Sequence, residues 1–96
     1  MKSLEEIKSQ LAQLKTELSK KYPIASMAIF GSVARSEATE NSDIDILVEF
    51  DGKIGSRFIS LANELESSLK NRVDLVSRKG IKQKYFERIK SDLVYV

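Results

Sequence analysis

The sequence predicts a single α/β domain in which a small mixed sheet is flanked by helices. Three short apolar segments rich in β-branched residues alternate with helical apolar stripes, the pattern of layered α/β folds. The chain has 96 residues, a length typical of one domain. Only one of the two strand connections has room for a helical crossover, so a mixed sheet is expected rather than an all-parallel one.

The first predicted helix occupies about residues 3–21. A capping-box pattern, Ser3-x-x-Glu6, opens it, and Pro23 follows its end. Its apolar positions recur at spacings of three and four residues and are Leu4, Ile7, Leu11, Leu14 and Leu18. This stripe packs either on the chain's own sheet or against another chain, for example in a homodimer. A run of about two heptads is short for a coiled coil.

The predicted catalytic core, about residues 24–96, holds three strands and the remaining helices. The predicted strands are residues 24–30, 44–50 and 73–77. The expected connections are a helical turn at 33–36, a polar loop at 39–42 and a helix at about 56–70. A last helix is expected to carry Ile81, Tyr85, Ile89 and Leu93 on one face.

Composition limits the chemistry that this chain can support. The absence of cysteine excludes disulfides and thiolate metal sites. The absence of histidine means that any metal would be held by oxygen, which suits Mg²⁺ or Mn²⁺. The N-terminal segment is polar rather than a signal peptide, and no apolar run approaches the roughly 18 residues that span a bilayer. We therefore expect a cytoplasmic protein with no membrane partner.

Two aspartates, Asp43 and Asp45, stand at the start of the second predicted strand. Side chains alternate along a strand, so both carboxylates face one side while Ile44 and Ile46 face the core. Neighbouring carboxylates repel each other unless they are solvated or share a cation. The pair is therefore either a solvated strand face or a metal site.

A third aspartate, Asp74, interrupts the apolar third strand between Val73 and Leu75. An aspartate inside an apolar strand is expected to be paired or metal-bound, because burying an unpaired carboxylate is costly. If the second and third strands are neighbours, three carboxylates can converge on one face. Such a set suits Mg²⁺, which takes one or two carboxylates, phosphate oxygens and water.

A candidate phosphate site lies at Gly31 and Ser32, which end the first strand and open a helical turn. Glycine permits close backbone approach, and the start of a helix offers free N–H groups. Ser32 adds a hydroxyl, and the guanidinium of Arg35 could pair with a phosphate. Ser42 is a further nucleotide-binding candidate or an ordinary loop residue. Each feature has an ordinary structural explanation, and the combination is more specific than any part.

The order Gly31-Ser32, ten residues, then Asp43-Ile44-Asp45 resembles the signature of the DNA polymerase beta-like nucleotidyltransferase superfamily. The longer string GSVARSEATENSDIDILVEF resembles the minimal nucleotidyltransferase (MNT) group in particular. The resemblance extends from about Ala28 to the end of the chain. Many relatives have glycine where this chain has Ser36, and serine would strain the loop if that position requires positive φ.

The resemblance implies a two-metal phosphoryl transfer from ATP. Asp43 and Asp45 would contact both Mg²⁺ ions, and Asp74 would hold the ion beside the acceptor hydroxyl. Gly31 and Ser32, with Arg35 and Ser42 as further contacts, would hold the triphosphate. MNT proteins are typically antitoxins of HEPN toxins, so the resemblance implies that AMP is transferred to a tyrosine of a HEPN partner. The short chain leaves no second domain for an acceptor, which agrees with a partner-supplied acceptor.

Three alternatives remain open from the sequence. The chain could neutralise its partner by binding alone, without catalysis. It could modify a small molecule in a pocket that a partner completes. A nucleic-acid binder is the least favoured, since the basic residues near the C-terminus fit the solvated face of a helix. Those residues are Arg78, Lys79, Lys82, Lys84, Arg88 and Lys90.

Overall fold

In the computed structural model, which describes residues 2–96, the capping box opens helix α1 (Leu4–Leu18) as the sequence predicts. The N–H of Glu6 donates to Ser3 Oγ at 3.2 Å, and the N–H of Ser3 donates to Glu6 Oε1 at 3.1 Å. The helix ends about one turn before the predicted end. The N–H of Ser19 still bonds back to the helix, but the next residues form a turn that leads into the sheet.

The three predicted strands form on the expected residues, as β1 (Ile24–Phe30), β2 (Ile44–Phe50) and β3 (Val73–Ser77). The sheet order is β3-β2-β1-β4, with β1 and β2 antiparallel and β2 and β3 parallel. Helix α3 (Arg57–Leu69) is the crossover that makes the parallel pair possible. The prediction of a mixed sheet is therefore confirmed.

The C-terminal segment differs from the prediction of one long helix. Helix α4 (Gln83–Ile89) stops early, a 3₁₀ turn η1 (Lys90–Asp92) follows, and the chain then enters a fourth strand, β4 (Val94–Tyr95). This strand pairs antiparallel with β1 through Ile29 and Ala28. The helical spacing extends past Ile89 in the sequence, but pairing with a distant strand overrides it.

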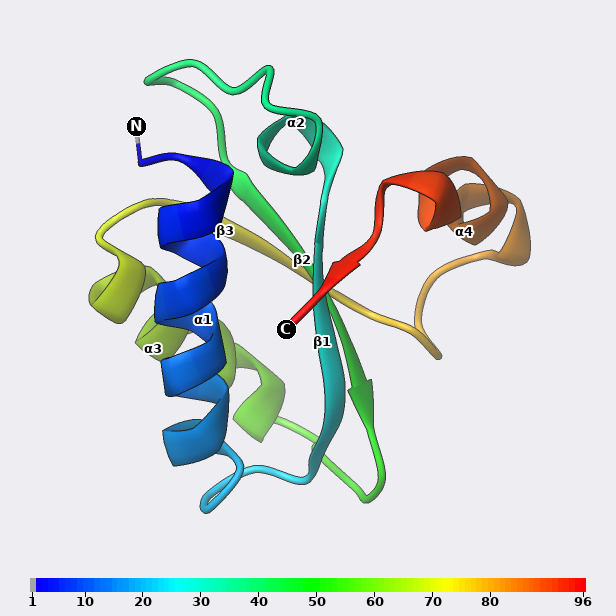
Figure 1. The fold of residues 1–96 in the computed structure, drawn as a ribbon. Helices are drawn as coiled ribbons and strands as arrows, with labels where there is room; N and C mark the ends of the chain where they lie inside the picture. The colour runs from blue at the N-terminus through cyan, green and yellow to red at the C-terminus, as the bar shows by residue number, and fades with distance from the viewer. Residues whose placement is uncertain (1) are drawn as a thin grey trace.

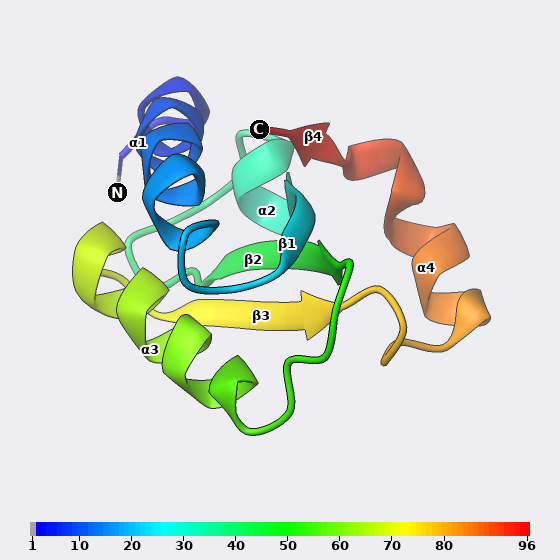
Figure 2. The ribbon, with the colours of Figure 1, turned by 90° about the horizontal axis from the view of Figure 1, so that it is seen from below.

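Helices cover both faces of the sheet (Figures 1 and 2). Helices α1 and α3 lie on one side of the strands, and α4 lies on the other. Ile7 and Leu11 of α1 are 1% and 0% exposed and pack with Leu61 of α3 in the larger core cluster. The α1 stripe therefore packs on the chain's own sheet. A smaller cluster beneath α4 contains Phe30 and Leu47.

The outer edge of β3 carries hydrogen bonds at both of its ends. The N–H of Val73 donates to Glu66 Oε2 of α3 at 3.0 Å. At the other end, the carbonyl of Ser77 accepts from the N–H groups of Gly80 and Ile81 at 3.0 and 3.1 Å.

In the part of the chain that the structure describes, no helix is long and apolar enough to span a bilayer.

Candidate active site

The junction between β1 and β2 brings Gly31 against Asp45. Phe30, the last residue of β1, is the register partner of Asp45, and helix α2 (Gly31–Ala34) begins at the next residue. Gly31 has φ +73°, and a Cβ at this position would lie 2.1 Å from Asp45 Oδ2. Glycine is therefore required both for the backbone conformation and for the close approach of the carboxylate.

Asp45 and Asp74 are register partners on the parallel strands β2 and β3. Leu47 and Val76, each two residues further along its strand, belong to the cluster beneath α4. Since side chains alternate along a strand, both carboxylates point to the α4 side of the sheet. The second and third strands are neighbours, as the predicted convergence of these two aspartates requires.

The environment of Asp45 disfavours its charged form. Burial, followed by repulsion from the carboxylates of Asp74 and Asp43, raises the pKa of Asp45 to about 6. The positive charge of Arg35 opposes the shift in part. The site thus has an excess of negative charge that a divalent cation would neutralise.

Asp43 makes a contact that the sequence does not reveal. Its Oδ1 lies 3.0 Å from Arg72 Nε in an ion pair, and Arg72 Nη2 donates to the carbonyl of Asn41 at 3.2 Å. Among residues 2–96, no three metal-ligating side chains stand close enough to hold one ion together. Repulsion acts over longer distances than Mg²⁺ coordination at about 2.1 Å, so the carboxylates can repel without forming a ligand cluster. Their oxygen chemistry and unbalanced charge fit Mg²⁺, once the Asp43 side chain reorients.

Asp74 is exposed, so the expectation that it is a costly buried carboxylate is wrong. Strand β3 is an edge strand, and its side facing α4 is open to solvent at this position. The polarity of Asp74 therefore needs no paired charge to explain it. Its role as a metal ligand remains a prediction that rests on its position beside Asp45.

Arg35, predicted to contact phosphate, lies between two carboxylates. Its Nε donates to Glu37 Oε1 at 3.1 Å and its Nη1 to Asp92 Oδ2 at 2.7 Å. Hydrogen bonds to Asp92 and then to Glu37 raise the pKa of Arg35 above its ordinary value, so it stays charged. Ser32 lies in the short helix α2 beside Gly31. Phosphate binding by Ser32 and Arg35 remains a prediction.

Ser42 closes the loop that precedes Asp43. Its Oγ accepts from the N–H of Thr39 at 2.9 Å, and its carbonyl accepts from Asn71 Nδ2 at 3.2 Å. These bonds tie the loop to itself and to the start of β3. They give Ser42 a structural role, while nucleotide contact by Ser42 remains a prediction.

Ser36 has φ +59°, the conformation that glycine adopts more readily. Replacing Ser36 with glycine should relieve the strain of a Cβ in the left-handed region and raise the free energy of unfolding by about 0.5–1 kcal/mol, after the entropy that glycine adds to the unfolded chain. Chemical denaturation of the two proteins measures this difference.

The matched control for that change is Ser36→Ala, which removes the hydroxyl and keeps the Cβ. It should give no gain in stability. An equal gain in both variants would show that the hydroxyl, and not the backbone conformation, is the unfavourable feature.

Three further residues border the site, and sequence reasoning did not single out two of them, Arg72 and Asp92. Arg72 contacts Asp43, Asp92 contacts Arg35, and the Tyr85 ring meets Phe30 edge-on with centroids 6.5 Å apart. Arg72 stands two residues before Asp74, at the start of the third strand. A basic residue at this position was the only sequence signal for a contact with the aspartates. The contacts of Asp92 and Tyr85 depend on the path of the C-terminal segment, which the sequence pattern mispredicts.

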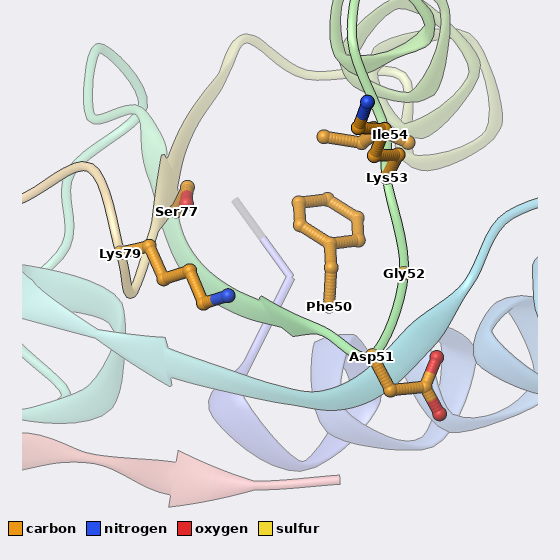
Figure 3. A pocket seen from close by; sticks show the side chains of 7 residues that line it. All are labelled: Phe50, Asp51, Gly52, Lys53, Ile54, Ser77 and Lys79. Carbon is orange, nitrogen blue, oxygen red and sulfur yellow. The ribbon is translucent and has the colours of Figure 1, made fainter.

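A pocket of about 650 Å³ lies at the other end of the same strands (Figure 3). Phe50 stands in its middle, with Lys79 on one side and Ile54 and Lys53 on the other, while Asp51 points away. The aspartates precede or begin β2 and β3, whereas this pocket follows their ends. It is therefore separate from the candidate active site.

Comparison with known proteins relates this arrangement to nucleotide transfer. The Nucleotidyltransferase domain family matches residues 11–96. A Methanocaldococcus jannaschii protein, provisionally named a protein adenylyltransferase, is 45% identical over 98 residues and covers all of both chains. The protein adenylyltransferase MntA of Thermococcus cleftensis is 42% identical over 98 residues, which covers 100% of this chain and 98% of MntA.

Solved structures share the fold. A chain provisionally described as a minimal nucleotidyltransferase superposes with a TM-score of 0.82 at 31% identity, over 97% of this chain and 95% of that one. A chain from the complex of the tri-AMPylated HEPN toxin of Shewanella oneidensis with an MNT antitoxin gives a TM-score of 0.70 at 19% identity. That match covers 96% of this chain and 70% of the other, and shows likeness of fold.

Proposed function

This chain belongs to the nucleotidyltransferase domain family, and we propose that it is an antitoxin that transfers AMP from ATP to a tyrosine of a HEPN toxin. The observation that carries the proposal is the placement of Gly31 against Asp45, with Asp74 beside it on the neighbouring strand. The backbone at Gly31, which a phosphate group can approach closely, therefore lies next to two carboxylates. Relatives of the same length named as protein adenylyltransferases support AMP as the group transferred.

The reaction joins the phenolic oxygen of the acceptor tyrosine to the α-phosphorus of ATP. The bond from that phosphorus to the pyrophosphate breaks, and pyrophosphate leaves with the bonding electron pair. The phenol must lose its proton, and its ordinary pKa is about 10. Asp74, an exposed carboxylate at the site, is the group that we assign to accept this proton.

The chain offers oxygen ligands for two Mg²⁺ ions, or for Mn²⁺, in Asp43, Asp45 and Asp74. Bound there, the ions would supply positive charge to the triphosphate and to the departing pyrophosphate. Gly31 and Ser32 would hold the phosphates through backbone N–H groups and a hydroxyl. Arg35 would add a charged donor beside them.

The exposure of the site supports a macromolecular acceptor. Asp43 and Asp74 are both exposed, so a side chain on the surface of another protein can reach them. The pocket near Phe50 cannot hold a small acceptor for this site, because it lies at the opposite end of the strands. The HEPN–MNT complex, in which one chain shares this fold, supports a HEPN toxin as the partner.

Intact-mass spectrometry tests the proposal directly. The purified chain, Mg²⁺, ATP and a candidate HEPN partner are mixed, and the partner is weighed. We expect the partner to gain the mass of one or more adenylyl groups, and the Asp43→Asn/Asp45→Asn double variant to add none. Glu49→Gln/Asp51→Asn, which removes two exposed carboxylates from the far end of β2 and the turn after it, should retain the activity.

A second candidate is neutralisation by binding alone, and the Arg72–Asp43 ion pair favours it. That contact occupies a carboxylate that transfer requires. If the double aspartate variant still forms a stable complex and silences the partner, and no mass is gained with the unmodified chain, binding is the function. Silencing that disappears with the double variant would support transfer.

A further inference from the structure

Arg35 is held by two carboxylates that lie far apart in the sequence. Glu37 is two residues away and accepts from Nε at 3.1 Å, whereas Asp92 is 57 residues away and accepts from Nη1 at 2.7 Å. The Glu37 side chain is 65% exposed and the Asp92 side chain 21% exposed. Asp92 is therefore the more buried of the two anchors.

The guanidinium keeps donors free in this arrangement. Arginine has five N–H donors in a planar fork, and these two contacts use one on Nε and one on Nη1. The remaining donors include both on Nη2. The backbone N–H of Arg35 donates to the carbonyl of Gly31 at 3.1 Å, so Arg35 lies one helical turn from the glycine that contacts Asp45.

The C-terminal segment is built so that Asp92 reaches this point. Strand β4 begins two residues after Asp92 and pairs with Ile29 and Ala28 of β1. These residues lie just before Gly31, so the segment is fixed to the strand that leads into the candidate phosphate site. The 3₁₀ turn η1 closes with a bond from the N–H of Leu93 to the carbonyl of Lys90 and presents Asp92 toward Arg35.

We propose that Asp92 is a positioning residue, which holds the Arg35 guanidinium in place so that its free donors meet the phosphates of the bound nucleotide. This inference rests on the proposed function. An arginine side chain that is not anchored loses rotamer entropy when a ligand immobilises it. Anchoring by Asp92 removes part of that cost before the nucleotide binds, which is preorganisation.

A double-mutant cycle on Arg35 and Asp92 tests the inference. The readouts are the Kd for the ATP analogue AMP-PNP with Mg²⁺, from calorimetry, and KM and kcat for transfer to the partner. We expect Asp92→Ala to raise the Kd and the KM for ATP about tenfold with little change in kcat, as loss of a preorganised charged contact would. Arg35→Ala should do the same, and the double variant should be no worse than Arg35→Ala.

Two further variants separate positioning from a general structural effect. Asp92→Glu should restore most of the affinity, because it keeps the carboxylate. Glu87→Gln removes the carboxylate that forms an ion pair with Lys90, three residues later in the same segment. This variant should bind nucleotide like the unmodified chain. Additive effects of Arg35 and Asp92, or tighter binding after Asp92→Ala, would overturn the inference.

The binding readout also separates this inference from the proposed function. If the unmodified chain binds AMP-PNP but modifies no HEPN partner, the proposed function fails and the cycle still decides the role of Asp92. If transfer occurs and Asp92→Ala binds and transfers like the unmodified chain, only the positioning role fails. A chain that binds no nucleotide would overturn both.

Discussion

Replacing Gly31 with alanine should abolish nucleotide transfer at a moderate cost in stability. The new Cβ would lie 2.1 Å from Asp45 Oδ2 and 3.1 Å from its Cγ, so the carboxylate must rotate away. Residue 31 would also hold φ +73° with a Cβ, which costs about 1–2 kcal/mol. With residual crowding, we expect the free energy of unfolding to fall by about 2–4 kcal/mol. Transfer should fall at least about a hundredfold, because even small misplacements of catalytic groups are that costly.

Gly55→Ala is the matched control for this experiment. Gly55 has φ +54°, but an added Cβ there would meet no atom within 4 Å. It therefore reports the cost of the backbone conformation without the clash. Chemical denaturation should show a loss of about 1–2 kcal/mol in Gly55→Ala, smaller than the loss in Gly31→Ala, and the intact-mass assay should show loss of transfer in Gly31→Ala only. Equal transfer by both would contradict the importance of the approach to Asp45.

Asp45→Asn should make the protein more stable near neutral pH and inactive. The pKa of Asp45 is raised from 3.8 to about 6 by burial and by the neighbouring carboxylates, so its charged form is disfavoured in the folded state. This difference between the two pKa values corresponds to about 3 kcal/mol, and partial solvation reduces the penalty to about 1–2 kcal/mol. Asparagine has nearly the same shape and no charge, and so removes this penalty.

The pH dependence of that gain follows from linkage. Between pH 3.8 and about 6, the folded state binds a proton at Asp45 that the unfolded state has lost, so stability falls as pH rises through this window. Above pH 6, the penalty is fully present. The gain from Asp45→Asn should therefore be largest above pH 6 and vanish only well below pH 3.8, where the carboxyl is neutral in both states.

Thermal denaturation across this pH range measures the effect. Asp51→Asn, at the exposed turn after β2, removes the same charge outside the acidic pair and should give little change. Mg²⁺ should stabilise the unmodified protein more than Asp45→Asn, because the ion relieves a repulsion that the variant lacks. A loss of stability in Asp45→Asn above pH 6 would contradict our account of this site.

The strands of this fold could be predicted from the sequence, and the C-terminal segment could not. The runs that end at Phe30, Phe50 and Ser77 are bounded by clear turn signals, and all three strands match the prediction. Ile81, Tyr85, Ile89 and Leu93 keep helical spacing, yet the chain leaves the helix after Ile89. Pairing of β4 with β1 is a contact between distant residues, which a local pattern does not contain.

The candidate site shows the same division. The glycine before Ser32 and the aspartates at the start of two strands follow from spacing and alternation, and the register of Asp45 with Asp74 agrees with them. The partners of these groups do not follow, because Arg72 and Asp92 reach Asp43 and Arg35 across gaps of 29 and 57 residues. Exposure of Asp74 depends on β3 being an edge strand, which the order of elements alone does not establish.

The hydrogen bonds at the two ends of β3 protect the sheet from growth by strand addition. The carbonyl of Arg72 and the N–H of Arg78 bond to the β2 side, so alternation turns residues 73, 75 and 77 outward. Glu66 covers the first of these and the turn after Ser77 covers the last, which leaves little more than Leu75 to pair with another chain. An edge this short is a poor template for aggregation. A second protein must therefore recognise this chain through its side chains and not by extending its sheet at β3.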